Sequence, residues 1–329
     1  MKSLTHSNNK HKTALVLGFT GGVGFEVAKA LLADSYHVTA LIRDPTQKTK
    51  FSHPNLIYQI GNAQDETLIN RLTQNKDVVL YGINYNYVDW ATLGVQTLEI
   101  TAQACIKSGS RLLFPGNIYG FAGTDESTTI NENTSIKPTF ELGEIRINME
   151  NRLEVLHKQF GLKYLIFRAG NYIGEFAPST WLAFLIKQNE KNKQVSLTTL
   201  GDINKTISWN YLPDLAYNLV QILNSKAEDL NDNEVFCFEG LRYSFTDIKN
   251  TLQKMTKQKV KQKKLSFVMI SILSIFMRKL RKTSSTRSLF EKTLLIDQTK
   301  LIKVLAKQNI KVKQTNIEQV FIGAGLIRI

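Results

Sequence analysis

Short apolar runs alternate with amphipathic segments through the first 170 residues of the chain. The runs predict strands at 14–17, 37–42, 56–59, 78–81, 111–114 and 164–167. The segments between them predict helices at 25–34, 66–74, 94–108 and 143–160. Such alternation is typical of a parallel sheet with crossover helices. We therefore predict an α/β protein with a Rossmann-type, doubly wound parallel sheet.

The pattern becomes less regular after Gly170. A helix is expected around 180–187, a strand near 206–211 and a helix at 213–223. We predict a flexible tail at 1–12 and an NAD(P)-binding domain at 13–175, to whose core the chain returns at about 205–225. Residues 176–329 then form mainly a smaller C-terminal substrate lobe, strongly basic from 251.

Glycines follow the first predicted strand at regular spacing. Gly18, Gly21 and Gly24 separate that strand from the helix expected at 25–34. This order places a nucleotide pyrophosphate on a helix N-terminus: the first glycine allows a tight turn, the second a close approach of phosphate, the third close helix packing. An ordinary turn is the alternative. The predicted cofactor loop comprises Gly18, Thr20, Gly21, Gly22, Val23 and Gly24.

The end of the second predicted strand bears on the choice of cofactor. An acidic residue there binds the ribose 2′-hydroxyl of NAD, whereas an arginine suits the 2′-phosphate of NADP. The chain has Arg43 followed by Asp44, and Asp44 can instead cap the next helix. Arg43 therefore favours NADP(H) over NAD(H), unless Arg43 and Asp44 form a solvent-facing pair.

Charge is distributed unevenly along the 329 residues. The formal net charge is +14, yet residues 251–329 hold 18 Lys/Arg against 3 Asp/Glu, and residues 1–250 hold 24 against 25. The predicted nucleotide domain is thus near neutral, and we expect no nucleic-acid partner. The basic C-terminal quarter indicates an anionic surface or substrate, or simply a solvated lysine-rich face.

The remaining composition narrows the class of protein. Cys105 and Cys237 lie in a predicted helix and a predicted strand, as small core residues would. The five histidines are dispersed, so we predict no metal site. Residues 1–13 lack the apolar core of a secretion signal, which predicts a cytoplasmic protein.

One uncharged segment bears on the predicted cytoplasmic location. Residues 265–277 carry no charge and are flanked by basic residues on both sides. They fall short of the roughly 20 residues needed to span a bilayer. The segment can be a helix packed over a substrate cleft, or it can provide peripheral membrane contact through 261–282.

Four motifs, in order, resemble one family. They are the glycine loop at 18–24, Asn117-Ile-Tyr-Gly120, Arg168-Ala-Gly-Asn-Tyr-Ile-Gly174 and Trp209-Asn-Tyr-Leu-Pro-Asp-Leu-Ala216. Together they resemble the extended short-chain dehydrogenases/reductases of the NAD-dependent epimerase/dehydratase type. The resemblance implies that Asn62 and Ala63 contact adenine, that Gly82 passes close to the cofactor ribose, and that Asn171 belongs to the cofactor site.

The family's catalytic positions are substituted here. Its members use a serine or threonine, a tyrosine and a lysine, and the matching positions are Pro115, Leu142 and Arg146. Leucine donates no proton and proline has neither hydroxyl nor N–H, whereas Arg146 can still bind ribose hydroxyls. Any proton donor must lie elsewhere, with Tyr119 as the first candidate and Tyr85, Tyr87 and Glu144 as others.

Two functions remain open. The first is an atypical NAD(P)-dependent oxidoreductase or epimerase-like enzyme that acts on an unknown carbonyl or sugar-like small molecule. The alternative is a catalytically inactive, NAD(P)H-responsive regulatory or binding protein, which can be peripheral to a membrane. The sequence leaves the substrate, the direction of reaction and the oligomeric state undetermined.

Overall fold

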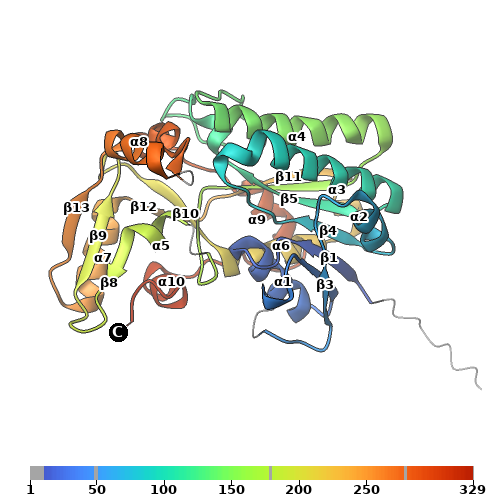
Figure 1. The fold of residues 1–329 in the computed structure, drawn as a ribbon, viewed down its shortest axis with the longest axis horizontal. Coiled ribbons are helices and arrows are strands. Elements are labelled where there is room, and N and C mark those ends of the chain that lie inside the picture. Colours follow the sequence, from blue (N-terminus) through green and yellow to red (C-terminus); the bar gives the residue numbers. More distant parts are fainter. Residues whose placement is uncertain (1–10, 48–50, 178–179, 278–279, 329) are drawn as a thin grey trace, which may run out of the picture.

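A computed structural model describes residues 11–47, 51–177, 180–277 and 280–328. Most of the expected tail at 1–12 lies outside these ranges. A parallel sheet of seven strands dominates the fold, in the order β11-β6-β5-β4-β1-β2-β3 (Figure 1). Its strands are β1 (Thr13–Leu17), β2 (His37–Ile42), β3 (Leu56–Ile60), β4 (Val78–Tyr81), β5 (Arg111–Asn117), β6 (Tyr164–Ala169) and β11 (Asn233–Phe238). The predicted Rossmann-type sheet is confirmed.

Helices cover both faces of the large sheet (Figure 1). One face carries α1 (Gly22–Ala33), α6 (Leu212–Leu223) and α9 (Thr299–Ala306), and the other carries α2 (Glu66–Thr73), α3 (Val95–Ser108) and α4 (Glu141–Phe160). Local signals set their ends. The Asp65 side chain accepts a hydrogen bond from the Leu68 N–H at the start of α2. Gly109 and Gly161, both with positive φ, directly follow α3 and α4.

The chain returns to the large sheet twice after β6. Helix α6 packs against α1, within the expected return at 205–225. Strand β11 then pairs in parallel with β6, from Asn233 opposite Tyr164 to Phe238 opposite Ala169. Helix α9 packs on α6 and β11 and buries Leu301 and Leu305 in the same core. The sheet is therefore completed by residues far beyond the first 175.

Two small sheets stand beside the large one (Figure 1). The first joins β7 (Asn171–Ile173), β10 (Ile207–Tyr211) and β12 (Leu241–Tyr243), and the second joins β8 (Ile186–Gln188), β9 (Val195–Thr199) and β13 (Lys261–Lys264). Around them lie α5 (Trp181–Leu185), α7 (Phe245–Thr256), α8 (Phe267–Phe276) and α10 (Ile317–Gly323). Buried aromatic side chains of Trp209, Phe245 and Phe290 form a separate core here.

Two smaller expectations meet different outcomes. The helix expected at 180–187 is shorter, because after Leu185 the chain pairs as β8 with β9 instead of continuing the helix. Cys105 and Cys237 are free and buried, as core cysteines should be. Within the described ranges, no helix is both long and apolar enough to cross a bilayer.

Candidate functional site

The turn between β1 and α1 is built from closely packed glycines. Gly18 has φ +82°, and the Gly21 N–H donates to the Gly18 carbonyl over 3.0 Å. A Cβ on Gly18 would overlap the Gly82 carbonyl, and one on Gly24 would overlap the Gly18 carbonyl. Neither position therefore accepts a side chain. Gly24 is buried under the turn, where it allows α1 to approach β1.

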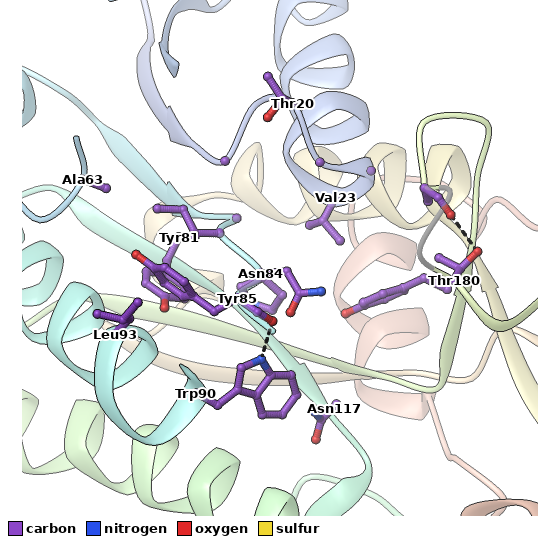
Figure 2. A pocket seen from close by; sticks show the side chains of 18 of the residues that line it. Thr20, Val23, Ala63, Tyr81, Asn84, Tyr85, Trp90, Leu93, Asn117 and Thr180 are labelled. Atoms are coloured by element: carbon purple, nitrogen blue, oxygen red, sulfur yellow. Dashed lines mark hydrogen bonds between the residues drawn. The ribbon is translucent and has the colours of Figure 1, made fainter. Parts of the chain in front are cut away.

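A cavity of about 510 Å³ lies at the carboxyl ends of the parallel strands, where α/β sheets bind ligands. Every predicted cofactor residue except Gly24 lines it: Gly18, Thr20, Gly21, Gly22, Val23, Arg43, Asn62, Ala63, Gly82, Arg146 and Asn171. Figure 2 shows Thr20 and Val23 on one side of the cavity, with Trp90 and Asn117 on the other. Ala63 and Thr180 lie toward its two ends.

The glycine loop fits a pyrophosphate group. Helix α1 begins at Gly22, and its cap residue Gly21 provides no side chain to bond the first-turn amides. Such free N–H groups at a helix start attract phosphate oxygens. An added Cβ on Gly21 would meet only the Gly18 carbonyl, at 3.4 Å. Gly21 thus leaves space in the cavity rather than in the protein core.

Arg43 and Asp44 have different surroundings at the end of β2. Arg43 is exposed and lines the cavity, whereas Asp44 does not line it. The Asp44 carboxylate accepts the Thr46 N–H over 2.8 Å, and this hydrogen bond lowers the pKa of Asp44. Asp44 therefore closes the local turn and leaves Arg43 as the charged group of the pair at the cavity. Nearby, the Asn62 side-chain oxygen accepts the Gln64 N–H over 3.1 Å, which leaves its amide hydrogens for a ligand.

Arg146, which the resemblance matches to the family's lysine, lies on α4. Its guanidinium donates to the Pro115 carbonyl and lies over the rings of Phe114 and Trp90, at 4.5 and 5.3 Å from their centroids. Burial lowers the pKa of Arg146, and the Glu150 carboxylate partly opposes this effect. The Nε atom of Arg146 is buried without a hydrogen-bond partner. Arg146 itself lines the cavity, where its guanidinium can donate to a ribose hydroxyl.

The other two family positions offer no catalytic group. Pro115 lies in β5 at the cavity wall and contributes only its carbonyl oxygen, which Arg146 occupies. Leu142 is fully buried in the core between the sheet and α4 and does not line the cavity. Neither of these two positions thus supplies an acid or a base to the cavity.

Tyrosines supply hydroxyl groups from other elements. The Tyr119 and Tyr87 hydroxyls are 2.9 Å apart at the cavity, whereas the Tyr85 hydroxyl bonds Thr97 at 2.8 Å. Burial raises the pKa of both Tyr119 and Tyr87, and Arg146 lowers that of Tyr119 in part. Both are therefore protonated at neutral pH. Glu144 is exposed and does not line the cavity, so its candidacy as proton donor was wrong.

An aromatic wall completes the cavity, and sequence reasoning missed most of it. Trp90 donates its indole N–H to the Tyr85 carbonyl over 3.0 Å and begins a π-helical turn that ends at Gly94. The wall also includes Leu93, Tyr172 and Trp181, with polar groups from Asn84, Asn117 and Thr180. The cluster Tyr85, Tyr87 and Trp90, directly after the fourth strand, was the available signal.

Comparisons with solved structures find the same architecture. UDP-glucuronic acid 4-epimerase from Bacillus cereus, bound to UDP-glucuronic acid and NAD, matches with TM-score 0.73 and 20% identity over 96% of this chain and 97% of that one. The Thermus thermophilus UDP-glucose 4-epimerase complex with NAD matches with TM-score 0.72 and 16% identity, covering 95% and 98%. A dTDP-glucose 4,6-dehydratase from Streptomyces venezuelae with NAD and TYD bound matches with TM-score 0.70 and 15% identity, covering 95% and 96%.

Sequence comparison gives the narrower result. No curated protein matches the chain. The model of the NAD dependent epimerase/dehydratase family matches residues 14–236, which contain the glycine loop, the segment 117–120 around Tyr119 and most of the large sheet. The chain therefore belongs to the NAD dependent epimerase/dehydratase family.

Proposed function

We propose that this protein is an NAD(P)-dependent oxidoreductase or epimerase-like enzyme with a non-standard proton donor. The observation that carries the proposal is one continuous cavity joining the glycine loop to a wall of aromatic and hydroxyl side chains. Its volume of about 510 Å³ falls within the range of roughly 300–1,000 Å³ usual for small-molecule sites. The substrate is a carbonyl compound or a sugar-like molecule, a class that includes the sugar nucleotides bound by the structural neighbours.

NADP(H) is the proposed cofactor, in preference to NAD(H). The support is Arg43, a charged group on the cavity wall whose acidic neighbour is engaged in a local turn. A guanidinium can bind a 2′-phosphate with two parallel hydrogen bonds. The first-turn amides of α1 would hold the pyrophosphate, and Arg146 would hold a ribose hydroxyl. When bound, the nicotinamide supplies hydride transfer.

Tyr119 is the proposed proton donor. Tyr119 lines the cavity, and its hydroxyl retains its proton at neutral pH because burial raises its pKa. It can therefore donate a hydrogen bond to a substrate oxygen, and the Tyr87 hydroxyl, 2.9 Å away, would then be the donor to Tyr119. Arg146 stabilises negative charge that develops on Tyr119. In this arrangement Arg146 acts by its charge, since it does not lose a proton.

One observation favours the second function, an NAD(P)H-responsive binding protein without catalysis. Of the positions that the resemblance matches to the catalytic residues, Pro115 has no hydroxyl, and Leu142 is buried and does not line the cavity. The two functions predict the same cofactor binding and differ only in turnover.

The deciding experiment measures NADPH and NADH oxidation, and the reverse reaction, with a panel of carbonyl compounds and sugar nucleotides. We expect turnover with a member of the panel that Tyr119→Phe lowers at least about a hundredfold, within the range of general acid catalysis. Tyr85→Phe is the matched control, because it also lines the cavity but bonds Thr97. Cofactor binding without turnover across the panel would favour the binding protein.

A further inference from the structure

Helix α8 presents an apolar face to solvent. Only Phe267 and Ile270 of its ten residues are buried. Large exposed side chains follow each other along the rest of the helix and just beyond it: Val268, Met269, Ile272, Leu273, Ile275, Phe276 and Met277, from 43% to 82% exposed. A contiguous exposed patch of this kind marks an interaction surface.

The helix contacts the lobe through Phe267 and Ile270, and its serines bond within the helix itself. Ser271 and Ser274 donate their hydroxyls to carbonyls one turn back within α8, and so need no solvent. None of the α8 side chains lines the cavity. The expectation of a helix packed over the substrate cleft is therefore wrong, and the wide apolar side is available to a partner.

The surroundings of α8 are basic. Between Asp247 and Glu291 the sequence has twelve basic residues and no acidic one. Lys261, Lys263 and Lys264 are all exposed on β13, an edge strand that ends shortly before α8. After the helix, exposed Arg281 donates to the Ser274 carbonyl. Further along the chain, Lys282 is paired with Glu141 and Arg287 with Glu291.

We propose that α8 and the lysines of β13 bind the surface of an anionic membrane. The apolar face would lie at the boundary of headgroups and acyl chains, with the lysines among lipid phosphates. Ten residues span about 15 Å, half the hydrocarbon thickness, so α8 lies in the surface rather than across it.

Charge argues for lipid over a second copy of this chain. Pairing two α8 faces would bring together two clusters of lysines that carry no acidic partners in the described contacts, and such like-charge contacts oppose association. An anionic lipid surface complements the same cluster. Phe267 anchors the helix against Phe290, with 6.1 Å between ring centroids, so the apolar face can be presented without unfolding the lobe.

The test is co-sedimentation of the full chain with vesicles of phosphatidylcholine alone or mixed with phosphatidylglycerol. We expect binding to the mixed vesicles and at least about tenfold weaker binding to the neutral ones. The double variant Ile272→Asp/Phe276→Asp should lose binding more than about tenfold, because burial of each such side chain contributes a factor of this order. Phe160→Asp, at an equally exposed apolar position on α4, should bind as wild type.

Charge-reversal variants distinguish binding to anionic lipid from nonspecific hydrophobic adsorption. Lys261→Glu/Lys263→Glu/Lys264→Glu should abolish binding to the mixed vesicles. The matched triple change at Lys107, Lys158 and Lys163, at the other end of the molecule, should not. Circular dichroism establishes that each variant is folded. Failure of the folded wild type to sediment with mixed vesicles, or concentration-dependent dimerisation that Ile272→Asp/Phe276→Asp abolishes, would overturn the proposal.

Discussion

At the scale of the residue, the glycines of the β1–α1 turn have separable effects. Gly18 has a positive φ and faces the Gly82 carbonyl, so its role lies in the fold. Gly21 has φ −94°, which any residue adopts, and a side chain there would project into the cavity. Stability and ligand binding should therefore respond to different glycines of one motif.

Gly18→Ala should lower the free energy of unfolding, by about 1–2 kcal/mol from the backbone conformation alone and further from the overlap with Gly82. Gly21→Val should lower that free energy less, because its φ suits any residue and the main cost is that of a poorer N-cap. Chemical denaturation of the two variants checks both statements. Equal destabilisation by the two changes would show that Gly21 also supports the fold.

Arg43 should determine the preference between cofactors. Removing it as Arg43→Ala should weaken NADPH binding about 10- to 100-fold, because a hydrogen bond to a charged group contributes about 1.5–3 kcal/mol, and should leave NADH binding unchanged. Isothermal titration with each dinucleotide measures the difference. Arg71→Ala, an exposed arginine on α2 outside the cavity, is the control. A similar loss for both dinucleotides would remove Arg43 as the 2′-phosphate ligand.

At the scale of the element, a buried ion pair joins α4 to β6. The Glu150 carboxylate accepts a hydrogen bond from Arg168 Nε over 3.0 Å, and the same oxygen lies 2.9 Å from Arg168 Nη2. Both side chains are less than a tenth exposed. A second pair, Glu99 with Arg152, joins α3 to α4 at the surface over 2.8 Å. Arg152 bonds both oxygens of Glu99, whereas Arg168 contacts one oxygen of Glu150. The two pairs also differ in their access to water.

Glu150→Gln should therefore destabilise the protein by on the order of 3 kcal/mol, because it leaves Arg168 charged and buried without a counter-ion. Glu99→Gln should cost about 1 kcal/mol or less, since water and salt screen an exposed pair. Denaturation midpoints of both variants test the contrast. A Glu150→Gln variant as stable as Glu99→Gln would show that the burial of this pair has no energetic consequence.

The elements of the large sheet could be predicted because each combines an apolar strand with an amphipathic helix nearby in sequence. The apolar runs at β1 and β4 and the glycines between β1 and α1 are local signals. Strand β11 joins this sheet by pairing with β6, and α9 covers it by packing on α6. Both partners are more than 50 residues away in the sequence, and no local pattern encodes these contacts.

The candidate site divides in the same way. The cofactor side follows strand ends and glycines, so sequence reasoning found its lining residues. The aromatic wall draws on Trp90, Tyr172 and Trp181 from three separate elements, and only the tertiary fold brings them together. The outward apolar face of α8 likewise contradicts the usual inward orientation, which the sequence pattern alone would favour.

At the scale of the whole molecule, the cavity draws on both parts of the chain. Its walls run from the glycine loop to Ala177, Thr180 and Trp181, which precede or begin α5. A dinucleotide should therefore order the β1–α1 turn and the start of α5 together, while α8, which contributes nothing to the cavity, should be unaffected.

Hydrogen exchange with and without saturating NADPH measures this directly. We expect slower exchange in the amides of 18–25 and around Trp181, with no change in Phe267–Phe276. Protection confined to α8 would contradict the placement of the ligand in the cavity. Protection of the glycine loop alone would show that the second lobe does not take part in binding.

The central claim is that this cavity binds a pyridine dinucleotide, and calorimetric titration with NADPH and NADH tests it most directly. The account predicts saturable binding of NADPH, tighter than that of NADH, and at least about a hundredfold weaker binding by folded Gly21→Val. Dinucleotide at 100 times its Kd should also raise the free energy of unfolding by about 2.7 kcal/mol. Absence of binding of either dinucleotide to the folded wild type, or undiminished binding by Gly21→Val, would contradict it.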